Sequence, residues 1–452
     1  MKVALFVHCF FPAHFYGTEK YTLDLARNLR KLGHSPVVVT AVFAGEPVQE
    51  TLLHRYEFEG IPVISIDKNR MPHTRVKETY YQPDMMPVLD ALLEEIAPDV
   101  VHVTHLLNHT AVLLEVLGRR SLPAVATFTD FFGFCYTNKL EAHDASLCAG
   151  PAMPAINCLA CHLKESAAWS TTRRAAFMRR PAGAAIAARA MYVFQALPSM
   201  RAGRVAGLVQ DLVQRPRTLM ALYRNYRRAI VPTAFIREAY ARNGYAGTMT
   251  RIPFGIDLDR APKKRSAGGP LVLGFVGQIM AHKGADILIE AARRALRPEQ
   301  YEIRIMGSLT QDAGYGARLA KAAEGLPVRF LGTFAQEKMR EVMDGLDALV
   351  IPSRWYENSP LVLLNALASH TPVIVSDVAG MTEFVREGVN GFAFERGSVD
   401  ALAKVLARIA ADPGLLHAMS AATDYDATTL SMTERTIEVY EQAIADASRA
   451  RI

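Results

Sequence analysis

The stretch DALVIPSRWYENSPLVLLNA (347–366) places a strand, a loop and a helix in immediate succession. Its first seven residues (347–353) form a short apolar run that is typical of a buried strand. Ser359 followed by Pro360 is a helix-start signal, because serine can accept a hydrogen bond from a first-turn amide and proline fits the first helical position. A helix starting here points its free amides and positive dipole end toward the loop that carries Glu357. The stretch therefore predicts an anion site, suited to a phosphate. An ordinary capped core helix after a solvated glutamate is the alternative.

The whole chain is long enough for two domains. It has 452 residues, of which 50% are hydrophobic and 21% are charged, whereas a single core rarely grows beyond about 250–300 residues. No uncharged apolar run of about 18 residues occurs, so we expect no transmembrane helix. The first eleven residues, MKVALFVHCFF, lack a small-residue cleavage site and lead into a helical pattern, which favours a buried strand over a secretory signal. We expect a cytoplasmic protein.

Strand-like and helix-like segments alternate through both halves of the chain. Between the first two strands, Tyr21, Leu25, Leu29 and Leu32 share one helical stripe that ends near Gly33. Apolar strands alternating with helices predict parallel sheets covered on both faces, and hence two doubly wound, Rossmann-like α/β domains. The expected strands lie at 2–10, 36–42, 61–66, 99–105, 124–130 and 228–233, and, after a linker at 261–270, at 271–279, 301–307, 328–334, 347–353 and 372–378.

Two further loops of the second half are expected at the same sheet edge as Glu357. Lys283 and Gly284 stand at a strand-to-helix junction, where an ammonium group and closely approaching backbone suit a diphosphate. Gly380 allows a bare backbone turn after the strand at 372–378, and Glu383 opens the next helical stretch. Because ligands of such sheets bind beyond the carboxyl ends of the strands, the three loops together predict a ligand site.

The chain resembles the family 4 glycosyltransferases, whose GT-B fold consists of two Rossmann-like domains facing each other across a cleft. Four blocks carry the resemblance: 16–40, 251–259, 275–292 and, most specifically, 352–392. The resemblance implies an N-terminal acceptor-binding domain (1–255) with an insertion at 131–228. It also implies a C-terminal domain (256–425) for a nucleotide-diphosphate sugar, and a last helix (426–452) that crosses back to the first domain.

The resemblance also implies roles for individual residues. Lys283 would contact the donor diphosphate, Glu357 would hydrogen-bond the transferred sugar, and Glu383 would lie at the nucleotide end of the pocket. Gly17 would let the donor phosphates approach from the first domain. Asp130 would position the acceptor hydroxyl or the donor sugar, with a turn-capping aspartate as the alternative. The predicted donor-binding set also includes Gln278, Asn358, Ser359, Pro360, Leu361, Val362 and Asn365.

Four positions depart from the family pattern. Asn365 stands in place of the second glutamate that usually holds the ribose hydroxyls, although an amide can accept from one hydroxyl and donate to another. Gln278 replaces a frequent arginine, Thr129 replaces the histidine before Asp130, and Tyr16 replaces the first of two glycines. These departures leave open a catalytically silent GT-B protein that binds a glycan or partner at the membrane. A GT-B epimerase or phosphorylase is a further alternative.

The favoured function is a retaining hexosyltransferase that uses a UDP- or GDP-sugar and a lipid-linked surface-polysaccharide acceptor. In this family the leaving phosphate helps to take the acceptor proton, so the protein mainly stabilises charge on the diphosphate with a lysine and helix amides. No acidic cluster predicts a catalytic divalent metal, and the fold typically works without one. His102 and His105 alternate with apolar residues on a strand and are expected to be packing or hydrogen-bonding groups.

Four cysteines open the insertion, with the spacing C-x12-C-x9-C-x2-C. In a cytosolic chain this spacing favours a metal site over disulfides. Four thiolates favour structural zinc with no open coordination position, with an iron–sulfur cluster or free thiols as alternatives. Cys9, on the first strand, is expected in the core. The four predicted ligands are Cys135, Cys148, Cys158 and Cys161.

A basic stretch follows the cysteines. From 164 to 228, thirteen Lys and Arg residues stand against two acids. Basic and apolar side chains together on helices indicate a segment that lies on anionic lipid, with a merely solvated pair of helices as the alternative. No nucleic-acid-binding motif is present. We expect peripheral attachment at the inner face of the membrane. The interleaved apolar residues are Trp169, Phe177, Met191, Tyr192, Val193 and Phe194.

Overall fold

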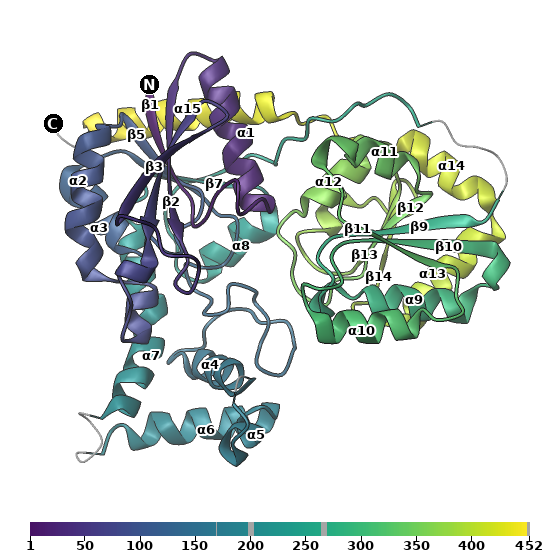
Figure 1. Cartoon of the computed structure of the whole chain (residues 1–452), viewed down its shortest axis with the longest axis horizontal. Helices are drawn as coiled ribbons and strands as arrows, with labels where there is room; N and C mark the ends of the chain where they lie inside the picture. The colour runs from purple at the N-terminus through teal and green to yellow at the C-terminus, as the bar shows by residue number, and fades with distance from the viewer. Residues whose placement is uncertain (169, 198–202, 264–268, 450–452) are drawn as a thin grey trace. The chain divides into compact units, whose positions relative to one another are not determined.

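The computed structural model of the chain describes residues 1–168, 170–197, 203–263 and 269–449. The chain divides into two compact units, one formed by Met1–Pro253 with Thr429–Ile452 and the other by Phe254–Thr428. Trp169 and residues 264–268 of the expected linker lie outside the described residues. Figure 1 labels the helices and strands.

The first unit contains an eight-stranded sheet with the strand order β3-β4-β2-β1-β5-β6-β7-β8. The chain runs from β1 outward to β2 and β4, and then resumes on the other side of β1 with β5 to β8. In open α/β sheets, ligands bind at such a reversal, outside the carboxyl ends of the strands. The strands are β1 (Lys2–Phe6), β2 (Ser35–Val42), β3 (Leu53–Phe58), β4 (Ile61–Asp67), β5 (Val100–Val103), β6 (Ala124–Thr127), β7 (Arg228–Val231) and β8 (Met249–Arg251).

One pair of strands in this sheet is antiparallel, which the sequence analysis did not predict. Strand β3 pairs antiparallel with β4, whereas every other neighbouring pair is parallel. Glu59 and Gly60, with φ of 53° and 75°, form a two-residue connection between the two strands. Left-handed backbone at both positions suits the tight hairpin turn that matches strand twist. Strand β3 is a half-exposed edge strand with several polar residues, so it has no apolar run from which a strand could be predicted.

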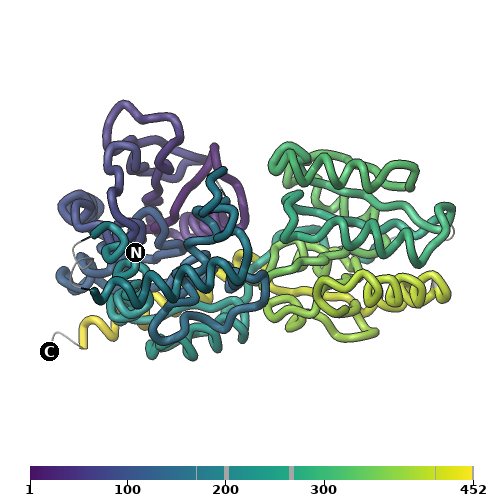
Figure 2. Tube along the Cα trace, turned by 90° about the horizontal axis from the view of Figure 1, so that it is seen from below, coloured from purple at the N-terminus to yellow at the C-terminus, as the bar shows by residue number. Residues whose placement is uncertain are grey.

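The helices of the first unit include the last one in the chain. Helix α15 (Thr429–Arg449) lies along α1 (Gly17–Lys31), as the yellow and purple segments show in Figures 1 and 2. The Tyr440 hydroxyl lies 2.6 Å from His102 Nδ1, and Asn28 Nδ2 donates to Thr429 Oγ1 at 2.8 Å. The other helices are η1 (Lys68–Arg70), η2 (Val76–Thr79), η3 (Pro83–Met85), α2 (Met86–Ile96), α3 (Val112–Arg120) and α8 (Ala234–Arg242).

The insertion forms a helical subregion with its own small core. It contains α4 (Ile156–Ala168), α5 (Arg173–Met178), α6 (Pro181–Phe194) and α7 (Arg204–Tyr223). Leu159 and Leu163 of α4 pack with Ala184 and Ala188 of α6, and with Leu212 of α7. Small residues on α6 let it approach its neighbours closely, since a Cβ on Gly183 would lie 2.0 Å from the Phe177 carbonyl oxygen.

The second unit contains a wholly parallel six-stranded sheet with the order β11-β10-β9-β12-β13-β14. Here the strand order reverses between β9 and β12, so the carboxyl ends of these two strands mark the expected ligand position. The strands are β9 (Leu271–Val276), β10 (Tyr301–Met306), β11 (Val328–Gly332), β12 (Ala348–Ile351), β13 (Val373–Ser376) and β14 (Gly391–Phe394). The helices are η4 (Ala281–Lys283), α9 (Ala285–Ala295), η5 (Pro298–Gln300), α10 (Ala313–Ala322), η6 (Gln336–Lys338), α11 (Met339–Asp344), α12 (Leu361–Ala368), η7 (Thr382–Phe384), α13 (Val399–Ala411) and α14 (Pro413–Ala422).

Candidate functional site

A buried carboxylate lies at the reversal point of the second sheet. Glu357, 7% exposed, follows β12, and Lys283 follows the neighbouring strand β9. The Lys283 ammonium donates to Glu357 Oε1 at 2.6 Å. Ser353 Oγ and Trp355 Nε1 donate to the same oxygen at 2.6 and 2.9 Å. The fold therefore brings together two of the residues that were predicted to bind the donor, Lys283 and Glu357.

The electrostatic state of Glu357 follows from these contacts. Burial alone would raise the pKa of this carboxyl. The Lys283 charge and the three hydrogen bonds outweigh burial, so the pKa is lowered. All three donors converge on Oε1, and no hydrogen bond among the described residues engages Oε2. The carboxylate is thus held ionised and oriented through one oxygen, and its second oxygen can accept from a ligand hydroxyl.

Two glycines let neighbouring loops approach the backbone of this site. Gly284 has φ of 75°, and a Cβ there would lie 2.1 Å from the Pro352 carbonyl oxygen. Gly380 has φ of 91°, and a Cβ there would lie 1.7 Å from the Glu357 carbonyl oxygen. Left-handed backbone and close approach both favour glycine. The three loops expected to form one site therefore do pack against one another.

The start of helix α12 differs from the prediction. The helix begins at Leu361 with Pro360 as its N-cap residue, and no side chain caps it. Ser359 has φ of 57°, and its buried Oγ makes no hydrogen bond with any described residue. The expectation that Ser359 caps the helix is therefore wrong: left-handed backbone turns this hydroxyl away from the first-turn amides. An unpaired buried hydroxyl at a strained residue is typical of a ligand-binding loop.

The remaining donor-side residues lie around the same loops. Asn365 is 4% exposed, and its Nδ2 donates to the Leu361 carbonyl oxygen of its own helix at 2.8 Å. Gln278 is half-buried beside Gly277, which borders open space, and Glu383 in η7 is exposed. Gly17, in the first unit, is the exposed first residue of α1. Asn358, Pro360, Leu361 and Val362 are half-buried at the start of α12.

A second polar cluster lies at the reversal point of the first sheet, beyond the ends of β1, β5 and β6. Asp130, which follows β6, bonds His105 Nε2 through Oδ2 at 2.7 Å. Its Oδ1 accepts from the Phe132 amide at 2.9 Å, which is the turn-capping role that was the alternative. The Leu107 amide donates to His105 Nδ1 at 3.1 Å. Asp130 therefore caps a turn and pairs with a histidine at the same time.

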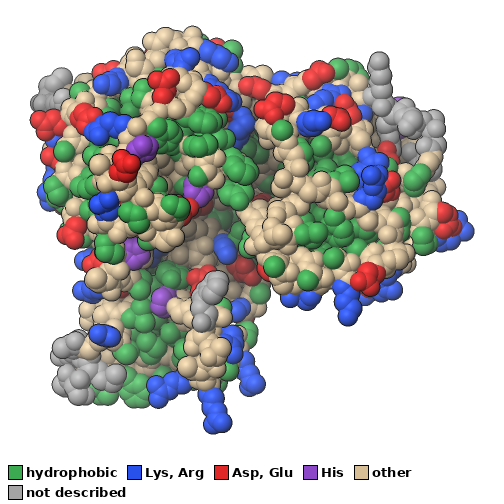
Figure 3. Space-filling view, in the orientation of Figure 1, with side chains coloured by type: hydrophobic (Ala, Val, Ile, Leu, Met, Phe, Trp, Pro, Cys, Tyr) green, Lys and Arg blue, Asp and Glu red, His purple; other side chains and the backbone are tan. Residues whose placement is uncertain are grey.

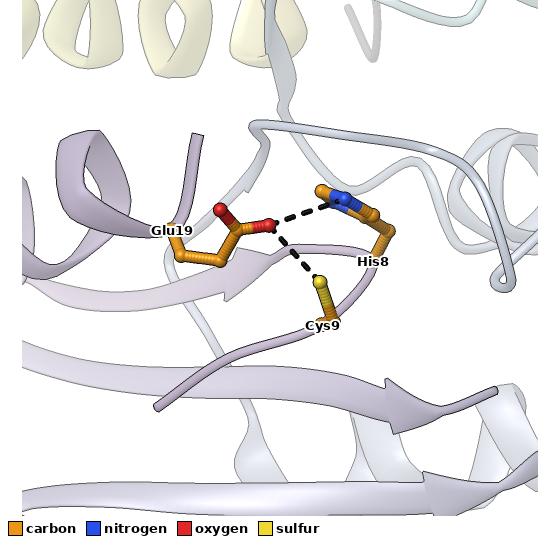
Figure 4. A group of neighbouring side chains, drawn as sticks. All are labelled: His8, Cys9 and Glu19. Carbon is orange, nitrogen blue, oxygen red and sulfur yellow. Dashed lines mark hydrogen bonds and ion pairs between the residues drawn. The ribbon is translucent and has the colours of Figure 1, made fainter. Parts of the chain in front are cut away.

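His8, Cys9 and Glu19 extend this cluster toward β1 (Figure 4). Glu19 Oε1 lies 3.2 Å from His8 Nε2 and accepts from Cys9 Sγ at 3.0 Å. Glu19 Oε2 and His8 Nδ1 are buried, and neither has a hydrogen-bond partner in the described part of the chain. The His8 ring lies against the His105 ring, with centroids 4.1 Å apart. Two unpaired polar atoms on one hydrogen-bonded pair of side chains are a natural place for a ligand hydroxyl or an ordered water.

The histidines of this cluster differ in charge preference. Burial lowers the pKa of His8 well below its usual value, and His105, His109 and His14 lower it further. Burial also acts to lower the pKa of His105, but Asp130 and Glu19 outweigh it and raise the value. His8 is thus held neutral, with Nε2–H toward Glu19 and the lone pair of Nδ1 unused.

His105, His8 and Glu19 were not among the predicted site residues, although His105 was expected to pack or to form hydrogen bonds. His102 is fully buried between Tyr440 and Thr127, as expected of a packing group. His105 stands two residues beyond the end of β5, and a polar residue just after a parallel strand could have been predicted as part of a ligand site. Cys9 is buried, 3% exposed, in agreement with the prediction. Glu19 was not predicted as a site residue, because a glutamate in the first helical turn is ordinarily a surface residue that complements the helix dipole.

The four cysteines of the insertion lie in one neighbourhood. Cys158 and Cys161 face the same side of α4, one turn apart, and Cys135 and Cys148 come from the preceding loops. Burial raises the pKa of Cys148, Cys158 and Cys161, and the charge of Cys135 adds to the increase in all three. Among the described residues, only His8, Cys9 and Glu19 bring three metal-ligating atoms within 4.8 Å of one another. The cysteine sulfurs are therefore gathered, but not at ligating distance.

The basic helices present a mixed surface. Phe177, Ile186, Val193 and Phe194 are 47–64% exposed on α5 and α6. Figure 3 shows basic and apolar side chains over this end of the first unit. Exposed arginines on and beside the same helices are Arg173, Arg174, Arg179, Arg180 and Arg189. Within the described part of the chain, no helix has the length and apolar character needed to span a bilayer.

Comparisons with known proteins agree with this architecture. Residues 258–424 match the model for glycosyl transferases group 1, and residues 15–145 match the model for glycosyltransferase family 4. A D-inositol 3-phosphate glycosyltransferase of Actinosynnema mirum is 32% identical over 191 residues, which cover 37% of this chain and 45% of that protein. The match thus spans slightly less than half of this relative's length.

Two solved structures share the fold over nearly the whole chain. Sucrose-phosphate synthase from Thermosynechococcus elongatus superposes with a TM-score of 0.64 at 18% identity, covering 98% of this chain and 99% of the other. Anabaena Alr3699/HepE in complex with UDP and glucose superposes with a TM-score of 0.60 at 16% identity, covering 98% and 100%. The two parallel-sheet units thus have the GT-B fold of glycosyltransferases. With both family models matched in order along the chain, the protein belongs to the family 4 glycosyltransferases.

Proposed function

We propose that this chain is an active retaining glycosyltransferase, which moves a hexosyl group from a UDP- or GDP-sugar to a lipid-linked saccharide. The observation that carries the proposal is the Glu357 carboxylate. It is buried, held ionised by Lys283 and oriented through one oxygen only. The three donors all contact Oε1, which leaves Oε2 available to accept from a ligand hydroxyl.

On the donor side, Glu357 Oε2 would accept hydrogen bonds from hydroxyls of the transferred sugar. Lys283 and the first-turn amides of α12 would face the diphosphate, where an ammonium group and helix amides stabilise negative charge. The buried, unpaired Ser359 hydroxyl is a further donor beside these amides. Glu383 would lie toward the nucleotide. The HepE structure was solved with UDP, which makes UDP-sugars the first donors to test.

The reaction needs no protein nucleophile. The bond between the anomeric carbon and the diphosphate oxygen breaks, and the acceptor oxygen bonds that carbon on the same face. The acceptor proton passes to the leaving phosphate oxygen. Each hydrogen bond that strengthens as charge grows on the diphosphate lowers the barrier, and loss of one such group typically costs about 10²–10³ in rate.

On the acceptor side, a cavity of about 360 Å³ in the first unit is lined in part by the loop after β1, and its volume is within the usual range of small-molecule sites. Phe10, Phe11 and Tyr56 line it, so aromatic faces are available to a sugar ring. Thr40 Oγ1 and Gln49 Oε1, in its wall, are buried without hydrogen-bond partners. We assign the acceptor saccharide to this cavity, with its reacting hydroxyl toward Asp130.

A lipid-linked acceptor would require access to a membrane. The exposed apolar residues of α6 lie among exposed arginines, and such a surface favours the interface of an anionic bilayer. We therefore assign α5 and α6 to peripheral contact with the inner leaflet. Flotation with vesicles of 70% phosphatidylcholine and 30% phosphatidylglycerol tests this role. Val193→Asp should reduce binding, whereas Val48→Asp is a matched control because both valines are 64% exposed. Equal losses in the two variants would refute the assignment.

Donor screening tests the catalytic proposal. Calorimetry with UDP, GDP and their sugars should identify one nucleotide that binds, and a labelled donor should yield a glycosylated lipid with retained anomeric configuration. Glu357→Gln should lower kcat/KM at least about 100-fold, while Glu324→Gln, at an exposed position, should not. If no nucleotide binds at millimolar concentration, the alternative of a catalytically silent GT-B protein would be favoured over the proposed enzyme. Free sugar phosphate or an isomerised sugar would indicate a phosphorylase or an epimerase.

A further inference from the structure

The cavity to which we assign the acceptor saccharide, here called the acceptor cavity, is polar but carries no lysine or arginine. Among the described residues that line it, Glu46 is the one acid, and none is a lysine or an arginine. Arg70, in the neighbouring η1, donates to the carbonyl oxygens of Gln49 and Glu50 and is not among the lining residues. Protein sites for phosphate and carboxylate groups ordinarily present arginine or lysine. The wall of the acceptor cavity therefore does not suit an anionic sugar.

Two side chains in this wall hold polar atoms that a ligand can pair. Thr40 Oγ1 and Gln49 Oε1 are buried and have no hydrogen-bond partner among the described residues, and Thr40 is 2% exposed. The Gln49 side chain is fixed by its other atom, because its Nε2 donates to Ser65 Oγ at 2.8 Å. Gln49 Oε1 can only accept a hydrogen bond, whereas the Thr40 hydroxyl can also donate one. A sugar hydroxyl can donate to Gln49, but a carboxylate or a phosphate dianion cannot.

Glu46 adds a negative charge to the wall. Its Oε2 accepts from the Phe43 amide at 2.9 Å, and its Oε1 lies 2.9 Å from His14 Nε2. The Gln49 amide donates to Asp67 Oδ2 at 2.8 Å, which ties the same loop to the end of β4. The carboxylate of Glu46 is therefore held on a fixed loop, and it repels any anion that enters the cavity.

Aromatic rings supply the apolar part of the wall. The Tyr56 hydroxyl donates to the Phe11 carbonyl oxygen at 2.6 Å. The Phe11 ring stacks on Phe58, with centroids 5.1 Å apart and planes inclined by 25°. These contacts hold the rings of Tyr56 and Phe11 in place. Ligand sites commonly combine such apolar faces with a few polar groups that fix orientation, and a hexose ring offers C–H groups for the first and hydroxyls for the second.

We propose that the acceptor cavity selects an uncharged, hydroxyl-bearing sugar ring and rejects sugars that carry a phosphate or a carboxylate. Thr40 and Gln49 bind hydroxyls of this sugar, Phe11 and Tyr56 contact its ring, and Glu46 excludes anions. This inference rests on the proposed function, because it describes the acceptor of the same reaction. It also defines the acceptor more narrowly, since the terminal sugar of the lipid-linked saccharide is then a neutral one.

Binding of matched sugars tests this selection. Full-length protein at pH 8, where an ordinary histidine is neutral, is titrated with the methyl glycosides of glucose, galactose and mannose and with the corresponding methyl uronosides, and binding is followed by saturation-transfer NMR. The two members of each pair differ only in a hydroxymethyl or a carboxylate group. At least one neutral glycoside should bind at least about tenfold more tightly than its uronoside, because like charges suppress binding of the wrong ligand. A uronoside that binds as tightly as its glycoside would overturn the proposal, and so would a lack of binding by all three glycosides.

Substitution of Thr40 locates the bound sugar. Thr40→Val removes the hydroxyl and keeps the shape of the side chain, so it should weaken glycoside binding at least about threefold. It should not lower the melting temperature, because this hydroxyl has no partner in the described part of the chain. If Thr40 only supported packing, the melting temperature would fall and glycoside binding would stay unchanged. Loss of glycoside binding in Glu357→Gln but not in Thr40→Val would place the sugar on the donor side and overturn the proposal.

Substitution of Glu46 tests the repulsion. Glu46→Gln removes the charge and keeps the size of the side chain, so the affinity for the uronoside should rise at least about threefold. Glu50→Gln is the matched control, because Glu50 is an exposed residue of the same loop and does not line the cavity. Equal uronoside affinities of the two variants would exclude the role of Glu46.

The glycoside titrations need no donor, so their outcome is separate from that of the donor screen. If no nucleotide binds but the glycosides are selected as stated, the proposed enzyme fails and the selectivity of the cavity stands. If a sugar is transferred but neutral and charged sugars bind equally, only the proposed selectivity fails.

Discussion

Lys283→Met is the most informative single substitution at the donor site. It removes the ammonium group 2.6 Å from Glu357 Oε1 but keeps most of the side-chain volume. Glu357 is 7% exposed, so its carboxylate cannot be fully rehydrated. Removing one partner of a buried pair typically costs about 3–5 kcal/mol. Because Ser353 and Trp355 still donate to the same oxygen, we expect the lower end, about 3 kcal/mol.

The loss should depend on pH in a defined direction. In wild type the pKa of Glu357 is lowered from 4.5, so its ion pair stabilises the fold above that pH and the contribution is lost as pH falls through the folded-state pKa. Without Lys283 the charge that opposed burial is gone, and burial should raise the pKa. The stability gap between wild type and variant should therefore be largest near pH 7. It should narrow as the pH falls to 4, because the carboxyl of the variant, with its raised pKa, becomes protonated and no longer places an unpaired charge in a buried site.

Tryptophan fluorescence can follow the second unit selectively. The chain has two tryptophans, so Trp169→Phe leaves Trp355, which bonds Glu357, as the only reporter. In this background, a loss of about 3 kcal/mol corresponds to a drop in melting temperature of about 6–12 °C at pH 7 for a unit of this size. Lys321→Met, at an exposed lysine, is the control. A gap that stays constant from pH 7 to pH 4, or equal stability of the two lysine variants, would refute this electrostatic account.

Three further predictions concern other parts of the two sites. Gly380→Ala should strongly weaken donor binding and lower stability, because its Cβ would lie 1.7 Å from a carbonyl oxygen. Gly388→Ala is the control: it has φ of 72° and open space around it, and it should lower the free energy of unfolding by only about 1 kcal/mol. Equal effects of the two substitutions in denaturation and calorimetry would contradict this prediction. Asn365→Glu should destabilise the unliganded protein by about 1–3 kcal/mol, because it buries a carboxylate and removes the hydrogen bond to the Leu361 carbonyl oxygen. The same substitution should tighten nucleotide binding if the side chain at this position contacts the ribose. An unchanged nucleotide affinity would count against that assignment. Burial lowers the pKa of His102 to about 3 and of His109 to about 4, whereas both histidines have a pKa of about 6.5 in the unfolded chain. Below pH 6.5 only the unfolded chain gains a proton on these residues, so acid favours unfolding. The free energy of unfolding should therefore fall by about 1.4 kcal/mol per pH unit for each histidine as the pH drops toward 5. His109→Gln should flatten this slope in urea titrations by that amount, and an unchanged slope would show that His109 is protonated in the folded state.

Much of the fold could be predicted because its signals are local. Apolar runs separated by helical stripes indicate parallel strands and helices, and residues that follow parallel strands must collect at one edge. These local patterns were sufficient to predict that Lys283, Glu357 and Gly380 lie at the same edge of the second sheet. They failed at three edge strands. Strand β3 is largely polar, β8 has only three residues and β14 has only four.

The rest of the site could not be predicted, because its chemistry depends on contacts between segments distant in sequence. By itself, the sequence determined which residue types stand at the ends of which strands, since strand ends and helix starts have local patterns. Only the tertiary structure decided that Glu357 is held through one oxygen and that His105 pairs with Asp130. Burial and charge compensation are properties of the packed chain, and no short window of residues contains both members of such a pair.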